Sequence, residues 1–136
     1  MKGENIITIQ VLSVEKMDEY EGSVLFQING NEYKAFFFGE EFISGESVVA
    51  TFDHLETSLE WDTIFNKNTQ KLKKLVTTTE AEWSYKGYGQ IKAINPVVAD
   101  FGDIQLDLGA LSNDPNVIGA YIYWEIERLD VSRDIP

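Results

Sequence analysis

The clearest structural signal in the chain is the stretch Gly22-Ser23-Val24-Leu25-Phe26-Gln27-Ile28-Asn29-Gly30. Apolar side chains occupy every second position, at Val24, Phe26 and Ile28, so they project to one side of an extended strand. Asn29-Gly30 follows, and this pair favours a type I′ turn because both central residues of that turn need a positive φ angle. The stretch therefore predicts a β-strand that enters a hairpin.

Other segments of the 136-residue chain show the same two-residue period, notably residues 48–53 and 103–108. Parallel strands need long crossover connections, which are usually helices, and the chain has room for one helix only. We therefore expect one domain over residues 1–136 with an all-β, mainly antiparallel architecture. It is either a barrel or a sandwich, and an OB-like barrel is one form of it.

The chain also contains an internal sequence repeat. The pattern of apolar residues and glycines in residues 11–14 and 22–28 recurs 80 positions later, and the pattern in residues 45–56 recurs 74 positions later. The offset changes where the first copy is expected to carry an additional strand. These matches predict two similar β-units, at about residues 9–56 and 89–130. In this alignment the apolar residues Val24, Phe26 and Ile28 correspond to Ile104, Leu106 and Leu108.

One helix is expected between the two units, as a connector over about residues 58–76. Thr57-Ser58-Leu59-Glu60 has the form of a capping box, in which side chains satisfy free backbone N–H groups at the helix start. Apolar residues then recur at helical spacing, and Asn68 is the polar gap in the stripe. The stripe consists of Trp61, Ile64, Phe65, Leu72, Leu75 and Val76.

Composition excludes several classes of protein. The chain has no cysteine, so disulfides, thiolate nucleophiles and cysteine-ligated metal centres are excluded. Its 11 basic and 23 acidic residues give a formal net charge of −12, which repels phosphate and argues against nucleic-acid binding. Neither a signal peptide nor a run of about 18 apolar residues is present. We therefore expect a cytoplasmic protein without a membrane partner, while the oligomeric state stays open.

The negative charge is concentrated in the first half of the chain. Residues 15–62 carry 12 acids and two bases, whereas residues 63–76 carry four lysines and no acid. Two acidic loops are expected at strand ends, near residues 15–21 and 40–46. They form either an ordinary solvated surface or a face that steers a basic partner protein. The carboxylates assigned to partner binding are Asp18, Glu19, Glu21, Glu40 and Glu41.

Aromatic residues occur in clusters, and most of them are expected in the core. Residues 36–38 and 121–124 lack a polar side, which predicts strands that are covered on both faces. The second cover is the helix, the other sheet or a partner protein. Tyr121 and Tyr123 share one face of their strand and are the candidate anchors at the centre of a partner interface.

The single histidine, His54, lies beside Asp53 and Glu56. A histidine oriented by a carboxylate is typical of a general base. No serine or threonine stands in a recognised nucleophile motif, however, and cysteine is absent. We therefore assign no catalytic residue and do not expect an enzyme.

Three further patterns are interpreted as structural. Asp103 and Asp107 fall on the polar face of a predicted strand, and residues 113–116 lack the terminal glutamate of a calcium loop. Gly87-Tyr88-Gly89 lacks the third glycine and the following helix of a dinucleotide motif, so a bulge or bend is expected there. We therefore expect neither a metal nor a cofactor.

Small, acidic, β-rich and cysteine-free, the chain resembles bacterial immunity proteins in general profile, although no specific residue carries the resemblance. Such proteins are made beside a secreted toxin, often a basic nuclease, and block it by binding. The resemblance implies a non-catalytic protein that neutralises a basic, toxin-like partner. The alternative is an OB-like or sandwich module that binds a small ligand, a sugar or single-stranded nucleic acid through exposed aromatic residues. An enzyme that uses carboxylates around His54 is the third hypothesis.

Overall fold

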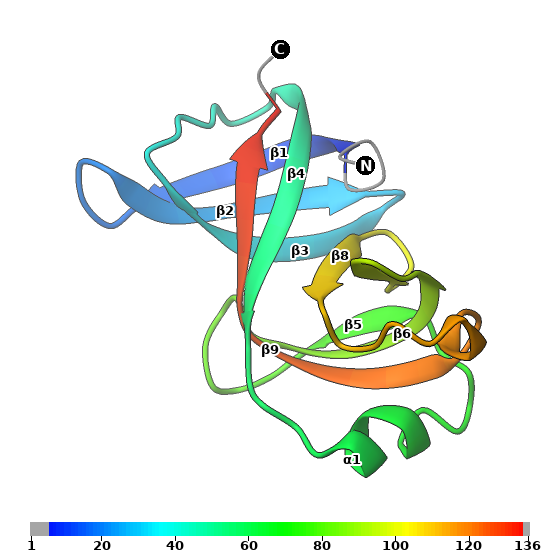
Figure 1. Cartoon of the computed structure of the whole chain (residues 1–136). Helices are drawn as coiled ribbons and strands as arrows, with labels where there is room; N and C mark the ends of the chain where they lie inside the picture. Colours follow the sequence, from blue (N-terminus) through cyan, green and yellow to red (C-terminus); the bar gives the residue numbers. More distant parts are fainter. Residues whose placement is uncertain (1–5, 135–136) are drawn as a thin grey trace.

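The computed structural model describes residues 6–134, which form nine β-strands, one short α-helix and one 3₁₀ turn (Figure 1). The expected all-β, mainly antiparallel architecture with one helix is confirmed. The elements are β1 (Ile7–Lys16), β2 (Glu21–Ile28), β3 (Asn31–Phe38), β4 (Ser47–Glu56), α1 (Trp61–Asn66), β5 (Lys74–Thr77), β6 (Tyr85–Ala93), β7 (Val97–Asp100), β8 (Gln105–Gly109), η2 (Pro115–Val117) and β9 (Tyr121–Arg133).

Five of the strands close into a barrel. β1 pairs with β4 along its first half and with β2 along its second half, and β2 pairs with β3. β9 pairs with β4 and closes the ring through a parallel contact with β3, between Phe36 and Asp130. A β-bulge between Val11 and Ser13 lets β1 bend from one neighbour to the other. This closed order of five strands is that of an OB-type barrel.

β9 belongs to both halves of the molecule. Its residues 121–126 pair with β6, and its residues 126–133 pair with β4. β7 and β8 extend the sheet from β6, and β5 also pairs with β6. Figure 1 shows β9 running from this second group of strands into the closed ring. The hydrogen-bonded order is therefore β3-β2-β1-β4-β9-β6-β7-β8.

The two halves have the same strand order. In each, a three-stranded meander is followed by a strand that pairs with the first strand of the meander: β1-β2-β3 with β4, and β6-β7-β8 with β9. The alignment of residues 22–28 with residues 102–108, predicted from the sequence, does not match equivalent strands of the two halves. Residues 22–28 lie in β2, the second strand of its meander, whereas residues 102–108 lead into β8, the third. The first half therefore has no additional strand, because β3 and β8 occupy equivalent places.

The residues that alternate in the sequence are buried as predicted. Phe26 is fully buried in the barrel, where its ring centroid lies 5.5 Å from that of Phe52 and 5.8 Å from that of Tyr33. Asn29 and Gly30 have φ angles of 52° and 83°, as a type I′ turn requires. The buried alternating positions are Val24, Phe26, Ile28, Ile104, Leu106 and Leu108.

The helix is much shorter than predicted. α1 ends at Asn66, and Glu60 occupies the N-cap position without a side-chain hydrogen bond, so the predicted capping box is absent. Asn68 then holds a loop, because its side-chain oxygen accepts from the N–H of Leu72 at 2.9 Å. Residues 74–77 form β5 instead of a helical turn because they pair with β6. The predicted helical connector over residues 58–76 is therefore wrong beyond α1.

Gly87 and Gly89 lie in a continuous strand, not in the predicted bulge or bend. Neither the β5–β6 nor the β6–β9 pairing shifts its register there. Both glycines face the buried ring of Phe101, which approaches so closely that a Cβ at either position would lie 2.8 Å from a ring carbon. Close packing, not a turn, therefore requires these glycines.

Candidate functional site

The two acidic loops predicted from the sequence meet at one end of the barrel. Glu21 at the start of β2 pairs with Phe38 at the end of β3, and the N–H of Gly39 donates to the carbonyl of Tyr20 at 2.6 Å. The β1–β2 turn and the segment after β3 therefore share one surface. We call it the tip surface, and it consists of Met17, Asp18, Glu19, Tyr20, Glu21, Phe38, Glu40 and Glu41.

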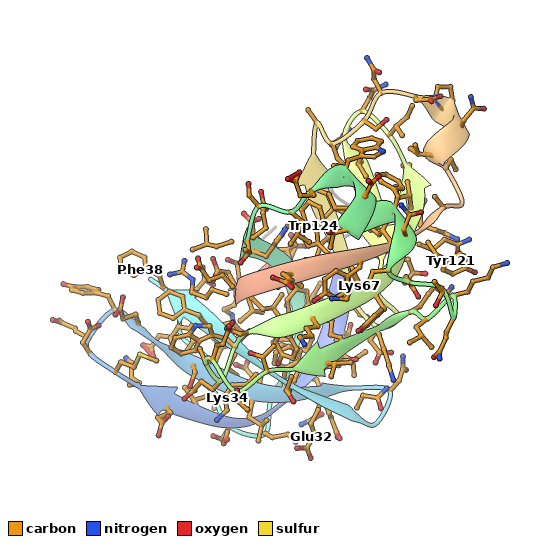
Figure 2. The ribbon with its side chains drawn as sticks, turned by 90° about the horizontal axis from the view of Figure 1, so that it is seen from below. Glu32, Lys34, Phe38, Lys67, Tyr121 and Trp124 are labelled. Atoms are coloured by element: carbon orange, nitrogen blue, oxygen red, sulfur yellow. The ribbon has the colours of Figure 1, made fainter. Side chains whose placement is uncertain are left out.

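Large apolar side chains are exposed among these carboxylates. Phe38 is 67% exposed, Tyr20 is 59% exposed and Met17 is 46% exposed. Figure 2 shows Phe38 at the edge of the molecule, away from the body of the fold. Exposed apolar patches are a feature of interaction sites, and aromatic residues and methionine are enriched in protein interfaces.

Sequence reasoning missed Phe38, because it predicted that residues 36–38 are covered on both faces. The prediction is right for Phe36 and Phe37, which are buried. The Trp83 ring packs edge-on against Phe36, with ring centroids 5.5 Å apart. Phe38 is the last residue of β3 and has no such cover. Its place directly before Gly39 is the signal in the sequence that indicates a strand end.

The carboxylates of the tip surface are held in different ways. Asp18 accepts hydrogen bonds from the backbone N–H groups of Tyr20 and Glu21, at 2.7 and 2.9 Å, and so stabilises the β1–β2 turn. Glu40 accepts from the backbone N–H of Arg133 at 2.9 Å. Within residues 6–134, the exposed carboxylates of Glu19 and Glu41 form no ion pair or side-chain hydrogen bond. These two are therefore the carboxylates most available to a partner.

Tyr121 and Tyr123 are not part of the tip surface. Tyr121 is half-buried, and in Figure 2 it lies on the opposite side of the molecule from Phe38. The side chain of Tyr123 is fully buried, its hydroxyl donates to Glu125 at 2.7 Å, and the Lys67 ammonium lies 4.2 Å from its ring centroid. The chain itself therefore covers this face of β9, and the assignment of Tyr123 as an exposed anchor is corrected.

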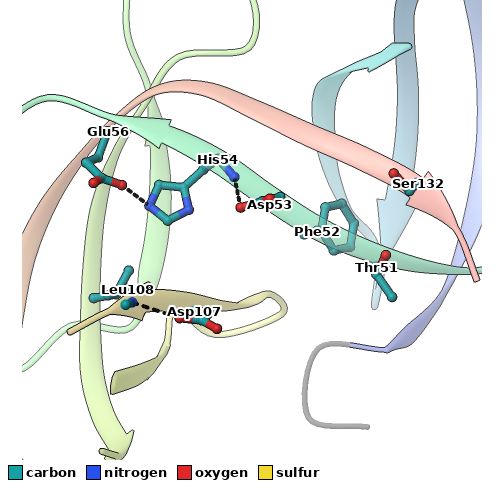
Figure 3. A pocket seen from close by; sticks show the side chains of 9 residues that line it. Thr51, Phe52, Asp53, His54, Glu56, Asp107, Leu108 and Ser132 are labelled. Atoms are coloured by element: carbon teal, nitrogen blue, oxygen red, sulfur yellow. Dashed lines mark hydrogen bonds and ion pairs between the residues drawn. The ribbon is translucent and has the colours of Figure 1, made fainter. Parts of the chain in front are cut away.

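His54 forms a second candidate site, between β4 and β8 (Figure 3). Its side chain is only 2% exposed and lines a cavity of about 480 Å³. The indole N–H of Trp124 donates to His54 Nε2 at 3.0 Å, and Oε1 of Glu56 lies 3.1 Å from the same nitrogen. Nδ1 of His54 has no hydrogen-bond partner within residues 6–134. Among residues 6–134, no hydroxyl group is hydrogen-bonded to the ring, so the arrangement of a base with its nucleophile is not found.

Burial holds the pKa of His54 below its usual value and outweighs the opposite effect of nearby carboxylates. The ring is therefore neutral at pH 7. This agrees with its geometry, because Nε2 can accept from Trp124 only when it carries no proton. The proton of the neutral ring is then on Nδ1. The carboxylates that favour the charged form are Glu56, Asp53, Asp107 and Asp130.

The stability of the protein is expected to depend on the protonation of His54. Its pKa is about 6.5 in the unfolded chain and lower in the fold, so the unfolded chain binds the proton more tightly. The stabilisation that comes from keeping His54 neutral is fully present above about pH 7. It is lost as the pH falls towards the folded pKa, and the free energy of unfolding then decreases by at most about 1.4 kcal/mol per pH unit. His54→Gln is expected to remove this slope, as urea unfolding from about pH 7.5 to 5.5 would show. Equal slopes in both proteins would contradict the expectation.

Asp103, one of the aspartates on the predicted polar strand face, lies in the bend before β8 and is held by side-chain hydrogen bonds. Among residues 6–134, no group of three histidine, aspartate or glutamate side chains is placed to hold a metal ion. Asp103 is half-buried and accepts hydrogen bonds from Tyr33, Asn29 and Asn31, at 2.6, 3.0 and 2.8 Å. Burial raises the pKa of Asp103, but these hydrogen bonds lower it below the usual value. Asp103 therefore joins the β2–β3 hairpin to the second half of the sheet.

Comparison with protein-family models, with curated proteins and with solved structures finds no match. Within residues 6–134, no helix has the length and apolar character that a membrane span requires.

Proposed function

We propose that this chain is an acidic, non-catalytic binding protein that neutralises a basic protein partner, in the manner of a bacterial immunity protein that blocks a toxin such as a nuclease. The tip surface is the proposed contact. One observation carries the proposal: Tyr20 and Phe38 are exposed on the same surface as five carboxylates. Aromatic side chains are typical anchors of protein interfaces, and carboxylates attract and orient a basic partner.

The charge of the whole chain supports the same proposal. A net charge of −12 attracts a basic protein from a distance and raises the rate of association. Glu19 and Glu41 meet this partner without first breaking an ion pair to a residue in the range 6–134. Complementary charge acts mainly on association and specificity, whereas buried aromatic contacts act mainly on dissociation. The two parts of the surface therefore have separable roles.

The alternative function, binding of single-stranded nucleic acid on the β2–β3 face of an OB-type barrel, has less support. Such binding needs a cationic groove along the strand. On this face Lys34 stands beside Glu32 (Figure 2), and its ammonium lies 3.6 Å from the carboxylate of Glu82. In the lysine-rich segment, Lys67 packs on an aromatic ring and Lys73 contacts Asp100 at 3.4 Å. Three of the lysines on which the alternative relies, Lys34, Lys67 and Lys73, are thus already engaged in contacts within the fold.

The proposal is tested with a partner identified by co-expression with neighbouring genes and shown to lose its activity when this protein binds it. We expect the variant with Glu19→Lys and Glu41→Lys to associate about tenfold more slowly at low salt. Phe38→Ala is expected to raise the dissociation rate about tenfold, because it removes an anchor. Raising the salt from about 50 to about 500 mM slows association of the wild type. Surface plasmon resonance measures all three effects.

The matched control carries Glu60→Lys and Glu80→Lys, which change the net charge by the same amount at exposed positions outside the tip surface. We expect its association rate to stay within about twofold of the wild type, because exposed charges remote from the contact act weakly. If the control slows association as much as the tip variant does, the tip surface is not the contact. A partner that proves acidic or neutral also contradicts the proposal.

A further inference from the structure

The cavity beside His54 lies where the second half of the sheet stays open. In the first half, the last strand of the meander, β3, closes the ring by pairing with β9. The equivalent pair in the second half is β8 with β4, since the strand order is the same in both halves. In the part of the chain that the structure describes, β8 and β4 share no backbone hydrogen bond. The cavity of about 480 Å³ occupies this seam.

Acidic, neutral polar and apolar groups line the seam, and none of the lysine or arginine side chains within residues 6–134 does. Asp53 and Glu56 extend from β4, Asp107 extends from β8, and all three residues are exposed. Asp53 accepts from the backbone N–H of His54, and Asp107 accepts from the backbone N–H of Gly109. The negative potential of three carboxylates favours a cation in the space between them.

The carboxylate of Glu56 has no good hydrogen-bond donor among its described neighbours. Its carboxylate lies 3.1 Å from Nε2 of His54, but that nitrogen already accepts the indole N–H of Trp124. A ring nitrogen that accepts one hydrogen bond has no proton to donate to a carboxylate. Glu56 therefore faces a lone pair, and a cation in the cavity would offer this carboxylate a better partner.

His54 is a second group in the seam that lacks a hydrogen-bond partner, at its Nδ1, within residues 6–134. Its side chain is 98% buried, and its Nδ1, which carries the proton of the neutral ring, has no acceptor in the part of the chain that the structure describes. Figure 3 shows the ring extending from β4 towards β8, with this nitrogen on the side away from Glu56. An unpaired buried donor is costly, so a ligand that brings an acceptor oxygen is favoured. Within residues 6–134 no hydrogen bond joins β4 to β8, so only side-chain packing separates Nδ1 from such an oxygen.

We propose that this seam is a binding site for an arginine or lysine residue in an extended peptide segment. The side-chain cation lies between the carboxylates of Glu56 and Asp107, and a backbone carbonyl of the peptide accepts from Nδ1 of His54. A cavity of about 480 Å³ is large enough for one such residue. The site is separate from the tip surface, so the proposal goes beyond the proposed function and does not depend on it.

The test uses the single histidine as a probe, because its ring signals in the NMR spectrum of the full chain are unique. We expect acetyl-Gly-Arg-Gly-amide to shift the His54 Cε1–Hε1 signal in a saturable way. The same peptide with citrulline in place of arginine has nearly the same shape but no charge, and we expect no saturable shift with it. A ¹⁵N spectrum of the free protein should show the proton on Nδ1.

The matched variants are Glu56→Gln with Asp107→Asn, which keep the shapes and the hydrogen-bond acceptors of both side chains. We expect them to weaken binding of the arginine peptide by about fivefold or more, whereas Glu60→Gln with Glu80→Gln changes it little. An unchanged ¹⁵N spectrum identifies variants that keep the His54 environment. Equal binding of the citrulline peptide, equal binding by the seam variants, or no saturable shift at all would each overturn the proposal.

Discussion

Replacement of Gly89 by alanine is expected to lower the free energy of unfolding by about 3 kcal/mol, the upper range for overpacking a core. The added Cβ would lie 2.8 Å from two ring carbons of Phe101 and 2.9 Å from the carbonyl oxygen of Asp100. Phe101 is fully buried, so its ring has little room to move. The carbonyl belongs to the backbone of β7, which pairs with β6 and cannot shift without disturbing that pairing. Urea unfolding followed by tryptophan fluorescence measures the loss.

A double-mutant cycle isolates the contact with the ring. Phe101→Leu alone is destabilising because it removes buried aromatic volume. It also makes room beside Gly89, so the second change, Gly89→Ala, is expected to cost clearly less in the Phe101→Leu background than in the wild type. Additive losses would show that the backbone carbonyl of Asp100, and not the ring, sets the cost of a side chain at this position.

Much of the fold could be predicted because local sequence patterns agree with the tertiary structure. The alternation at Val24, Phe26 and Ile28 is a property of one strand, and Asn29-Gly30 encodes its own turn. Residues 72–76 carry no such unique pattern, because Leu72, Leu75 and Val76 fit helical spacing while residues 74–77 fit a short strand equally well. Pairing with β6, whose partner residues lie about 8 to 14 positions further along the chain, decides between the two. Local propensity therefore does not determine whether residues 74–77 form a helix or a strand.

The candidate site could be predicted only in part. The sequence shows two acidic loops. They lie side by side only because β2 pairs with β3 and the N–H of Gly39 donates a hydrogen bond to the carbonyl of Tyr20. Tyr123 is covered in part by Lys67, which lies far away in the chain. The hydrogen bond that occupies Nε2 of His54 comes from Trp124, 70 residues away. Each of these is a long-range contact, and alternation along one strand does not reveal it.

Asn68 shows how a local anomaly in the sequence marks such a contact. It is the polar gap in the apolar stripe, and it is buried, with 6% of its surface exposed. Its amide N–H groups point to the carbonyl oxygens of Leu72 at 2.9 Å, Ile122 at 3.1 Å and Gly89 at 3.4 Å. One side chain thus fastens the loop after α1 to both β6 and β9. Its loss removes the side-chain donors that these carbonyl groups share and the acceptor that binds the N–H of Leu72.

We expect Asn68→Ala to lower the free energy of unfolding by about 3 kcal/mol, because buried polar groups lose their partners. Asn68→Asp should cost more, although it changes fewer atoms. A carboxylate cannot donate, so it would place negative charge against the carbonyl oxygens that the amide now satisfies. Asn66→Asp, at the exposed end of α1, is the control and should change stability by less than about 1 kcal/mol.

The relative stability of the two Asn68 variants distinguishes hydrogen bonding from packing. Both variants would be destabilised even if Asn68 merely filled space, so a loss of stability alone does not decide. Aspartate has nearly the same volume as asparagine, so a role in packing alone predicts that Asn68→Asp is milder than Asn68→Ala. A role as hydrogen-bond donor predicts the reverse order at pH 7. It also predicts that the gap between the two variants narrows towards about pH 4, because a protonated aspartic acid donates again. Urea unfolding of both variants at the two pH values decides between packing and hydrogen bonding as the force that fastens this loop to β6 and β9.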